Sequence, residues 1–146
     1  RLGLARPRLG LEERERPLGR NGKAEHLRLR VARLDVALAP HERIDALIAV
    51  ALSLPHRSEA AIRIWAAGDV RVAESLSAVD AARRDAVARY LREIGIDPGH
   101  ADRFAATSLL LFIGHQAAGT PLEELEWSMR HFVETDPQVR AALVVR

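Results

Sequence analysis

Residues 104–114, with the sequence FAATSLLLFIG, are apolar on nearly all sides when wound as a helix, and they decide the fold class. A helix of this kind is buried between neighbours that contact it on opposite faces. Asp97 and Pro98 supply an acid and a proline where a helix start favours both, and Gly95 before them is suited to end a preceding helix. The stretch therefore predicts a central helix over about 98–117 within a bundle.

Apolar residues recur three and four positions apart on both sides of this run, which is the spacing of amphipathic helices. The pattern predicts helices over about 24–38, 42–54, 69–95 and 121–135, with a shorter helix over 58–67. Residues 136–146 are expected to be a loose tail, although Val139, Leu143 and Val144 could extend a short helix. No stretch predicts a strand, so we expect an all-α antiparallel bundle of about six helices, with residues 24–146 as one domain.

Local capping signals are expected to set the ends of two of these helices. Ser58 is a suitable N-cap for the short helix, and Gly68 is suited to stop it. Thr120, Pro121 and Glu123 have the order of an N-cap, a first helical residue and a capping-box acid. These signals predict that the last long helix starts at Pro121.

The composition favours helices and excludes several kinds of chemistry. The chain has 146 residues, a length typical of one domain. Of these residues 48% are hydrophobic and only 4% are aromatic. It has no cysteine, which excludes disulfides, thiolate metal sites and cysteine catalysis. No apolar run approaches the roughly 18 residues of a spanning helix, so we expect no membrane association and a cytoplasmic protein.

Residues 1–23 differ from the rest of the chain and are expected to be irregular. They combine glycines and prolines with arginines, and residues 1–33 contain ten Lys or Arg against four Glu. Three interpretations compete: a basic arm that contacts nucleic acid, an expression remnant, or an out-of-frame reading of a GC-rich gene. The remainder of the chain is mildly acidic, which argues against an extended nucleic-acid surface there.

The six histidines do not form a recognisable metal site, because no two have the short helical spacing of zinc ligands. The chain also lacks a glycine-rich phosphate loop and a nucleophile elbow. We therefore expect no enzyme activity, no metal and no cofactor. His115 and His131 lie on apolar elements, where a core or interface histidine is the favoured interpretation.

Polar groups on the 98–117 helix offer the best candidate for a binding site. Phe104, Ser108, Leu111 and His115 lie near one face, with Thr107 beside them, and an apolar surface with a few polar groups suits a small-molecule pocket. The alternative is that Thr107 and Ser108 bond back to carbonyls four residues earlier in the same helix.

The order of motifs along the chain resembles the C-terminal regulatory domain of TetR-family (tetracycline-repressor-like) transcriptional regulators. Residues 63–72 (RIWAAGDVRV) are similar to a segment of the form R-x-W-A…D-x-x-V in that family. Residues 79–84 and 90–97 then resemble the family's long helix and its end, and 101–114 its next apolar helix. The resemblance covers about residues 30–135.

The resemblance implies a homodimer that binds a small hydrophobic or aromatic effector. The candidate ligand-binding residues are Ile48, Leu52, Ile62, Trp65, Tyr90, Phe104, Thr107, Ser108, Leu111 and His115. In the family the last two long helices pair with those of a partner, which gives as dimer-interface candidates Leu110, Ile113, Gly114, Ala117, Leu125, Trp127 and Met129.

The N-terminal helix-turn-helix of that family is not recognisable in residues 1–23. We therefore expect DNA binding only through a missing N-terminal domain, which the effector would control by a shift between helix arrangements. The alternative is a helical scaffold with a filled core and no effector. The surroundings of Trp65 are expected to distinguish the two functions. Trp65 would line a cavity in an effector-binding domain and fill one in a scaffold.

Overall fold

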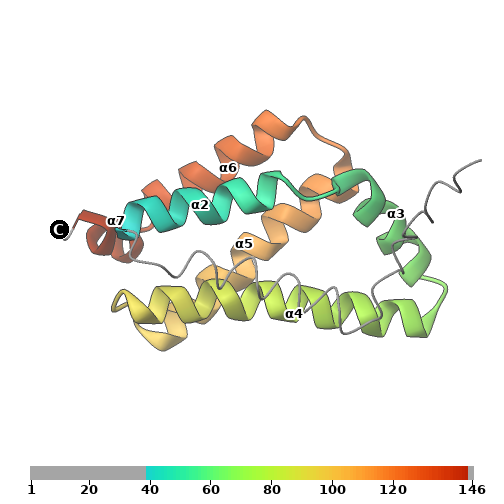
Figure 1. Ribbon diagram of the computed structural model, residues 1–146, viewed down its shortest axis with the longest axis horizontal. Helices are drawn as coiled ribbons and strands as arrows, with labels where there is room; N and C mark the ends of the chain where they lie inside the picture. Colours follow the sequence, from blue (N-terminus) through green and yellow to red (C-terminus); the bar gives the residue numbers. More distant parts are fainter. Residues whose placement is uncertain (1–38, 145–146) are drawn as a thin grey trace, which may run out of the picture.

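The computed structural model describes residues 39–144, which fold as six α-helices joined by short connections (Figure 1). The helices are α2 (Pro40–Leu52), α3 (His56–Ala66), α4 (Val70–Glu93), α5 (Pro98–Ala118), α6 (Leu122–Thr135) and α7 (Pro137–Val144). The predicted all-α bundle is confirmed, with no strand anywhere between residues 39 and 144. The predicted irregular segment 1–23 and helix 24–38 lie outside the described residues.

The central element is α5, which packs most extensively on α4 and also contacts α3 and α6. In Figure 1, α6 and α2 lie in the upper half, α4 runs along the lower edge, and α5 crosses obliquely between them. α2 packs on α6 and α7, while α3 packs on α4 and α5. None of the helices within the described part of the chain is long and apolar enough to cross a bilayer.

The main core joins α2, α4, α5 and α7 at one end of the bundle. Its buried residues are Ile44, Ile48, Tyr90, Leu91, Ile96, Ala101, Phe104 and Val139. The ring of Phe104 stacks on Phe132 of α6 with centroids 4.3 Å apart. The Tyr90 hydroxyl donates a hydrogen bond of 2.8 Å to the Pro40 carbonyl, and burial raises the pKa of this phenol although Arg43 opposes the shift.

Local signals set the ends of α4 and α5, and those at Gly95, Asp97 and Pro98 were predicted. The Asp69 carboxylate accepts hydrogen bonds from the amides of Arg71 and Val72 at the start of α4. The Asp97 carboxylate caps α5 in the same way, with Pro98 in the first turn. Gly95 has φ 92°, a conformation that favours glycine, and it ends the turn after α4.

Two predicted helix starts are wrong. α3 begins at His56 with Pro55 as the N-cap, so Ser58 lies inside the helix. α6 begins at Leu122 with Pro121 at the N-cap position and no side-chain cap. The Thr120 hydroxyl does not cap α6, because it instead pairs with Nδ1 of His115 at 2.7 Å.

The expected loose tail forms the helix α7, apart from residues 145 and 146, which lie outside the described part. Asp136 caps this helix by accepting a hydrogen bond of 3.0 Å from the Val139 amide. The other carboxylate oxygen of Asp136 lies 2.8 Å from Nε2 of His100 and ties α7 to the start of α5. Val139 is fully buried, so its burial adds to the capping in holding α7 against the core.

Residues 39–144 cover only one side of α5, although the sequence predicts burial on opposite faces. Leu110 is 66% exposed, and Gly114 and Ala117 are exposed on the same side of the helix. A Cβ atom added at Gly114 would meet nothing within 4 Å. An apolar face of the central helix is therefore left uncovered by the other helices of the described part of the chain.

Candidate functional site

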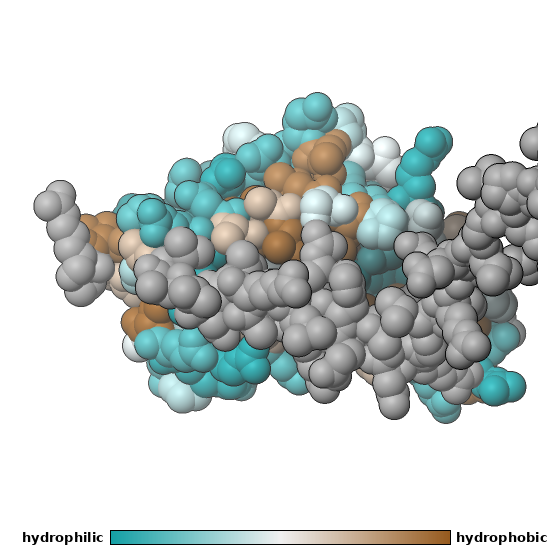
Figure 2. Space-filling view, in the orientation of Figure 1, coloured by the Kyte–Doolittle hydropathy of each residue, from teal (hydrophilic) through white to brown (hydrophobic). Residues whose placement is uncertain are grey.

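An apolar groove with a volume of about 110 Å³ lies between four helices and is partly open to solvent. Its walls come from α2 (Leu47, Val50, Ala51, Leu54), α4 (Arg83, Arg84, Ala86, Val87), α5 (Ala105, Ser108, Leu109, Phe112) and α6 (Met129). Figure 2 shows apolar side chains near the middle of this face, where α2 and α6 lie, with hydrophilic side chains above and below them. We refer to this feature as the groove.

Small side chains keep the groove open. Ala51, Ala86 and Ala105 come from three different helices and line it together with Ser108. Side chains this small leave space that leucine or phenylalanine would fill, while the helices stay apart because larger residues pack elsewhere. The Ser108 hydroxyl is turned back to the Phe104 carbonyl at 3.0 Å, so it does not add a free polar group to the wall.

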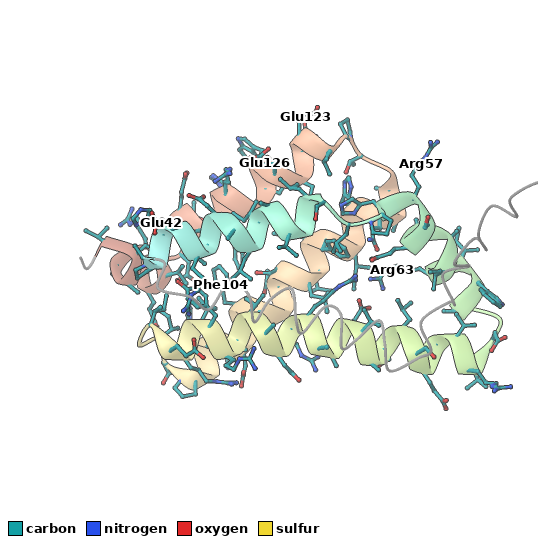
Figure 3. The ribbon with its side chains drawn as sticks, viewed as in Figure 1. Glu42, Arg57, Arg63, Phe104, Glu123 and Glu126 are labelled. Carbon is teal, nitrogen blue, oxygen red and sulfur yellow. The ribbon has the colours of Figure 1, made fainter. Side chains whose placement is uncertain are left out.

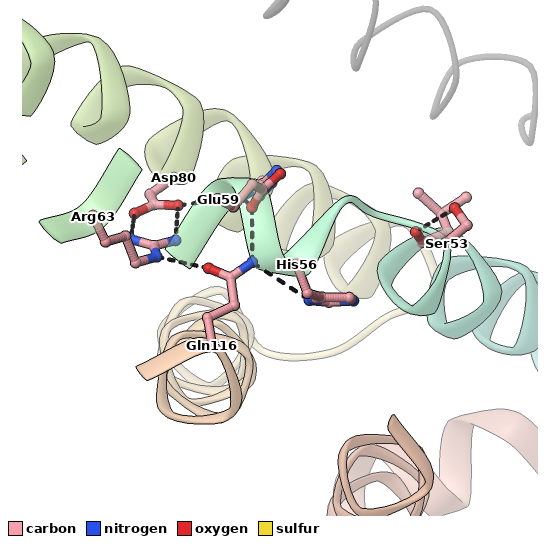
Figure 4. A network of polar contacts seen from close by, with 8 residues as sticks. Ser53, His56, Glu59, Arg63, Asp80 and Gln116 are labelled. Atoms are coloured by element: carbon pink, nitrogen blue, oxygen red, sulfur yellow. Dashed lines mark hydrogen bonds and ion pairs between the residues drawn. The ribbon is translucent and has the colours of Figure 1, made fainter. Parts of the chain in front are cut away.

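A cluster of polar side chains, which we call the charged network, joins α3, α4 and α5 beside the groove (Figure 4). Its members are His56, Glu59, Arg63, Asp80, Arg83 and Gln116. Arg63 donates two hydrogen bonds to Asp80, at 2.7 and 2.9 Å, and Arg83 donates two to Glu59, at 2.6 and 3.0 Å. These four side chains are only 14–15% exposed, and their two positive and two negative charges balance.

Arg83 also pairs with Asp80 at 3.5 Å, which joins the two ion pairs, and a second link between them comes from Gln116 of α5. Its side-chain oxygen accepts a hydrogen bond of 2.7 Å from Nε of Arg63, and its amide nitrogen donates one of 2.8 Å to Glu59. The side chain is 5% exposed, so these partners satisfy a polar group that would be costly to bury alone. Figure 3 shows Arg63 directed from α3 toward the bundle, whereas Arg57 points away from it.

The charged network explains how α3 attaches, because no residue of this helix is fully buried. Its inward side carries His56, Glu59 and Arg63 at helical spacing, and these residues meet the charges of α4 and the amide of α5. These charged residues were not among the predicted site residues, because apolar residues were expected on the inner face of the helix. A signal for the network was present in the sequence. Glu59 and Arg63 lie one helical turn apart on one helix, Asp80 and Arg83 lie one turn apart on the next, and each acid can pair with the arginine of the other helix.

A pair of histidines lies at the end of the charged network. The rings of His56 and His115 meet edge to face with centroids 4.8 Å apart, and His56 also contacts the ring of Phe112 at 5.2 Å. Burial lowers the pKa of His115, and the positive charge that His56 can take up lowers it further. Nδ1 of His115 is paired with Thr120, so this nitrogen already has a partner.

The structure does not bring the ten predicted ligand-binding residues into one cavity. Only Ser108 among them lines the groove. Ile48, Tyr90 and Phe104 are buried in the main core, and Leu52 packs against it. Ile62 and Leu111 are partly buried, and neither lines the groove.

Trp65 is 61% exposed and does not line the groove, so it neither lines nor fills that space, contrary to the expectation. The helical repeat explains this, because Trp65 lies opposite Arg63 on α3 and Arg63 faces inward. The neighbouring Ile64 is also exposed, at 78%.

Polar groups among the predicted ligand-binding residues form hydrogen bonds within the chain. Thr107 is exposed and its hydroxyl bonds to the Arg103 carbonyl, as the alternative interpretation predicted. Tyr90 bonds to the backbone of α2 and His115 to Thr120.

The predicted dimer-interface residues divide into two groups. Leu110, Gly114, Ala117 and Trp127 are exposed, and Ile113 is partly buried beside them in sequence. Leu125 is 2% exposed, and Met129 packs against the main core and lines the groove. Leu125 and Met129 therefore serve the interior of the single chain rather than an outer surface.

Among residues 39–144, no group of three or more histidine and acidic side chains has a geometry that could hold a metal ion. Comparisons of the sequence and the structure with protein-family models, curated proteins and solved structures found no match.

Proposed function

We propose that the chain is the effector-binding and dimerisation domain of a TetR-like transcriptional regulator, and that the groove binds a small hydrophobic or aromatic effector. The observation that carries this proposal is the groove itself, an apolar recess walled by four helices beside a filled core. Its volume of about 110 Å³ compares with the roughly 150 Å³ of an apolar cavity that holds benzene.

The exposed face of α5 supports the dimerisation part of the proposal. Leu110 is 66% exposed and Trp127 of α6 is 63% exposed, while Gly114 and Ala117 allow another helix to approach closely. A second copy of the chain would give α5 the neighbour on its open side that its apolar sequence predicts. Leu110→Glu is then expected to convert a dimer to a monomer in sedimentation analysis, and an unchanged sedimentation coefficient would contradict this part.

The single methionine of the chain provides a direct test of the groove, because Met129 is in its wall. Labelling with [¹³C-methyl]methionine gives one NMR signal from inside the site. Titration with 1-hexanol, a small apolar probe, is expected to shift this signal in a saturable manner.

Two alanines of α2 make a matched pair of variants for this titration. Ala51→Phe adds a ring inside the groove and is expected to abolish the saturable shift. Ala49→Phe makes the same change at an exposed position of the same helix and should leave it intact. Trp65→Ala should also leave it intact, because Trp65 does not line the groove.

The alternative function is a helical scaffold without an effector. It predicts that 1-hexanol produces no saturable shift at Met129 while the chain still forms a dimer. Binding that persists in Ala51→Phe would contradict the assignment of the groove as the site.

A further inference from the structure

The charge of the groove wall indicates which class of effector it takes. Arg83 and Arg84, at consecutive positions of α4, contribute mainly the apolar parts of their side chains to the wall, and no acidic residue of the part 39–144 lines it. We propose that the effector is a small organic monocarboxylate, whose apolar part occupies the groove and whose carboxylate lies at Arg84 on its edge. This inference rests on the proposed function of the groove and adds the chemical class of its ligand.

Arg83 is held firmly at the wall and keeps one donor unused. Its terminal nitrogens bond to Glu59, and the guanidinium lies over the ring of Phe112 at 5.0 Å. Its Nε atom is buried and has no hydrogen-bond partner among the described residues. Because this atom is buried, a ligand in the groove does not reach it, and Arg83 serves to fix the wall next to Arg84.

Arg84 provides a positive charge that is only weakly paired within residues 39–144. Its ion pair within the described residues is with the adjacent Asp85, at 3.9 Å, and Asp85 is 74% exposed. The Arg84 side chain is 45% exposed, and it borders both the groove and a neighbouring hollow that Asp80 and Leu109 also line. Because the charges of the network balance, Arg84 makes this edge of the groove attractive to an anion.

The size of the groove limits the apolar part of the ligand. A volume of about 110 Å³ accommodates roughly one ring or about six carbons by comparison with the cavity that holds benzene. A ligand of this length in the groove would bring its head group to the edge where Arg84 lies. Aliphatic and aromatic monocarboxylates share this chemistry.

Hexanoate and 1-hexanol are matched probes, because they have the same number of carbons and differ in the charged head group. We expect hexanoate to bind about tenfold more tightly than 1-hexanol at pH 7 and low ionic strength, measured on the Met129 methyl signal of the full chain. Arg84→Gln is expected to reduce this preference to about one while leaving the affinity for 1-hexanol unchanged. The 1-hexanol titration also shows that the variant is folded.

Arg89→Gln is the control, because it removes the same charge from an exposed position of α4 that does not line the groove. It should retain the tenfold preference. Equal affinity for both probes in the unmodified chain would overturn the inference and leave the proposed function standing. Equal losses in Arg84→Gln and Arg89→Gln would also overturn it, since overall charge would then explain the preference. Binding of neither probe would overturn both the inference and the proposed function.

Discussion

Replacement of Asp80 by asparagine is expected to destabilise the bundle and to loosen α3 in particular. The Asp80 carboxylate accepts two hydrogen bonds from Arg63, at 2.7 and 2.9 Å, and both side chains are 15% exposed. Asparagine retains one oxygen and turns an amide nitrogen toward the guanidinium, so Arg63 loses both the opposite charge and one acceptor.

The expected cost follows from the burial of this pair. An exposed ion pair contributes about 0.2–1 kcal/mol, whereas breaking a fully buried pair costs about 3–5 kcal/mol. Because the Arg63–Asp80 pair is mostly but not completely buried, we expect a loss of about 2–3 kcal/mol in the free energy of unfolding. For a domain of this size, that loss lowers Tm by about 8–12 °C.

Urea and thermal unfolding measure the global effect, and hydrogen exchange locates it. Asp85→Asn is the matched control on the same helix, because Asp85 is 74% exposed and its contact with Arg84 is 3.9 Å long. This control should change stability by less than about 0.5 kcal/mol. In Asp80→Asn, the amides of α3 should lose protection before those of α5, since α3 has no fully buried residue.

A small effect would refute this reasoning. If Asp80→Asn and Asp85→Asn both change the free energy of unfolding by less than about 0.5 kcal/mol, the charged network does not hold α3 in place. Uniform loss of protection in α3 and α5 would show that the pair supports the whole bundle rather than the attachment of one helix.

Phe104→Ala should cost about 3–5 kcal/mol in urea unfolding, because it removes a buried ring stacked on Phe132; a cost below about 1 kcal/mol would contradict this packing. Tyr90→Phe should cost about 1 kcal/mol by removing the buried hydrogen bond to the backbone of α2, and unchanged stability would mean that this bond contributes nothing. Burial and the charge of His56 lower the pKa of His115, so the unfolded chain takes up a proton near pH 6.5 and the folded chain only at lower pH. Stability should therefore fall as the pH decreases below about 7 toward the lowered pKa, and His115→Gln should reduce this fall; parallel pH profiles of the two proteins would contradict the assignment.

The positions of the helices could be predicted because the signals for them are local. Asp69 and Asp97 cap α4 and α5 through hydrogen bonds to amides two and three residues away, and Gly95 ends α4 through its own backbone conformation. These interactions depend on neighbouring residues only. The predicted start of α6 was wrong because Thr120 forms a hydrogen bond with His115, a residue of the preceding helix.

The rule that apolar residues face the interior does not predict which side of α3 points inward. Trp65 and Ile64 lie outward because Arg63 and Glu59 face inward, and partners on α4 and α5 satisfy these charges. A buried charge is acceptable only where its partners are in place, and those partners come from distant parts of the sequence. Which face of α3 points inward is therefore decided by tertiary contacts.

The groove was missed for a related reason. Ala51, Ala86 and Ala105 look like ordinary core positions, and their small size matters only because they meet around one space. The distance between α2 and α4 depends on how both pack on other helices, which no short stretch encodes. A search for small residues on the inner faces of three helices would have pointed to this region.

Arg83 belongs to both the groove and the charged network and so connects the two. It lines the groove, lies over Phe112 of α5 and donates two hydrogen bonds to Glu59 of α3. A ligand that displaced this guanidinium would have to break its bonds to Glu59 or move α3 with it, because the paired geometry leaves little freedom. Since α3 has no fully buried residue, moving the helix requires less apolar exposure than moving α5. The arrangement therefore favours α3 as the element that would respond to occupation of the groove.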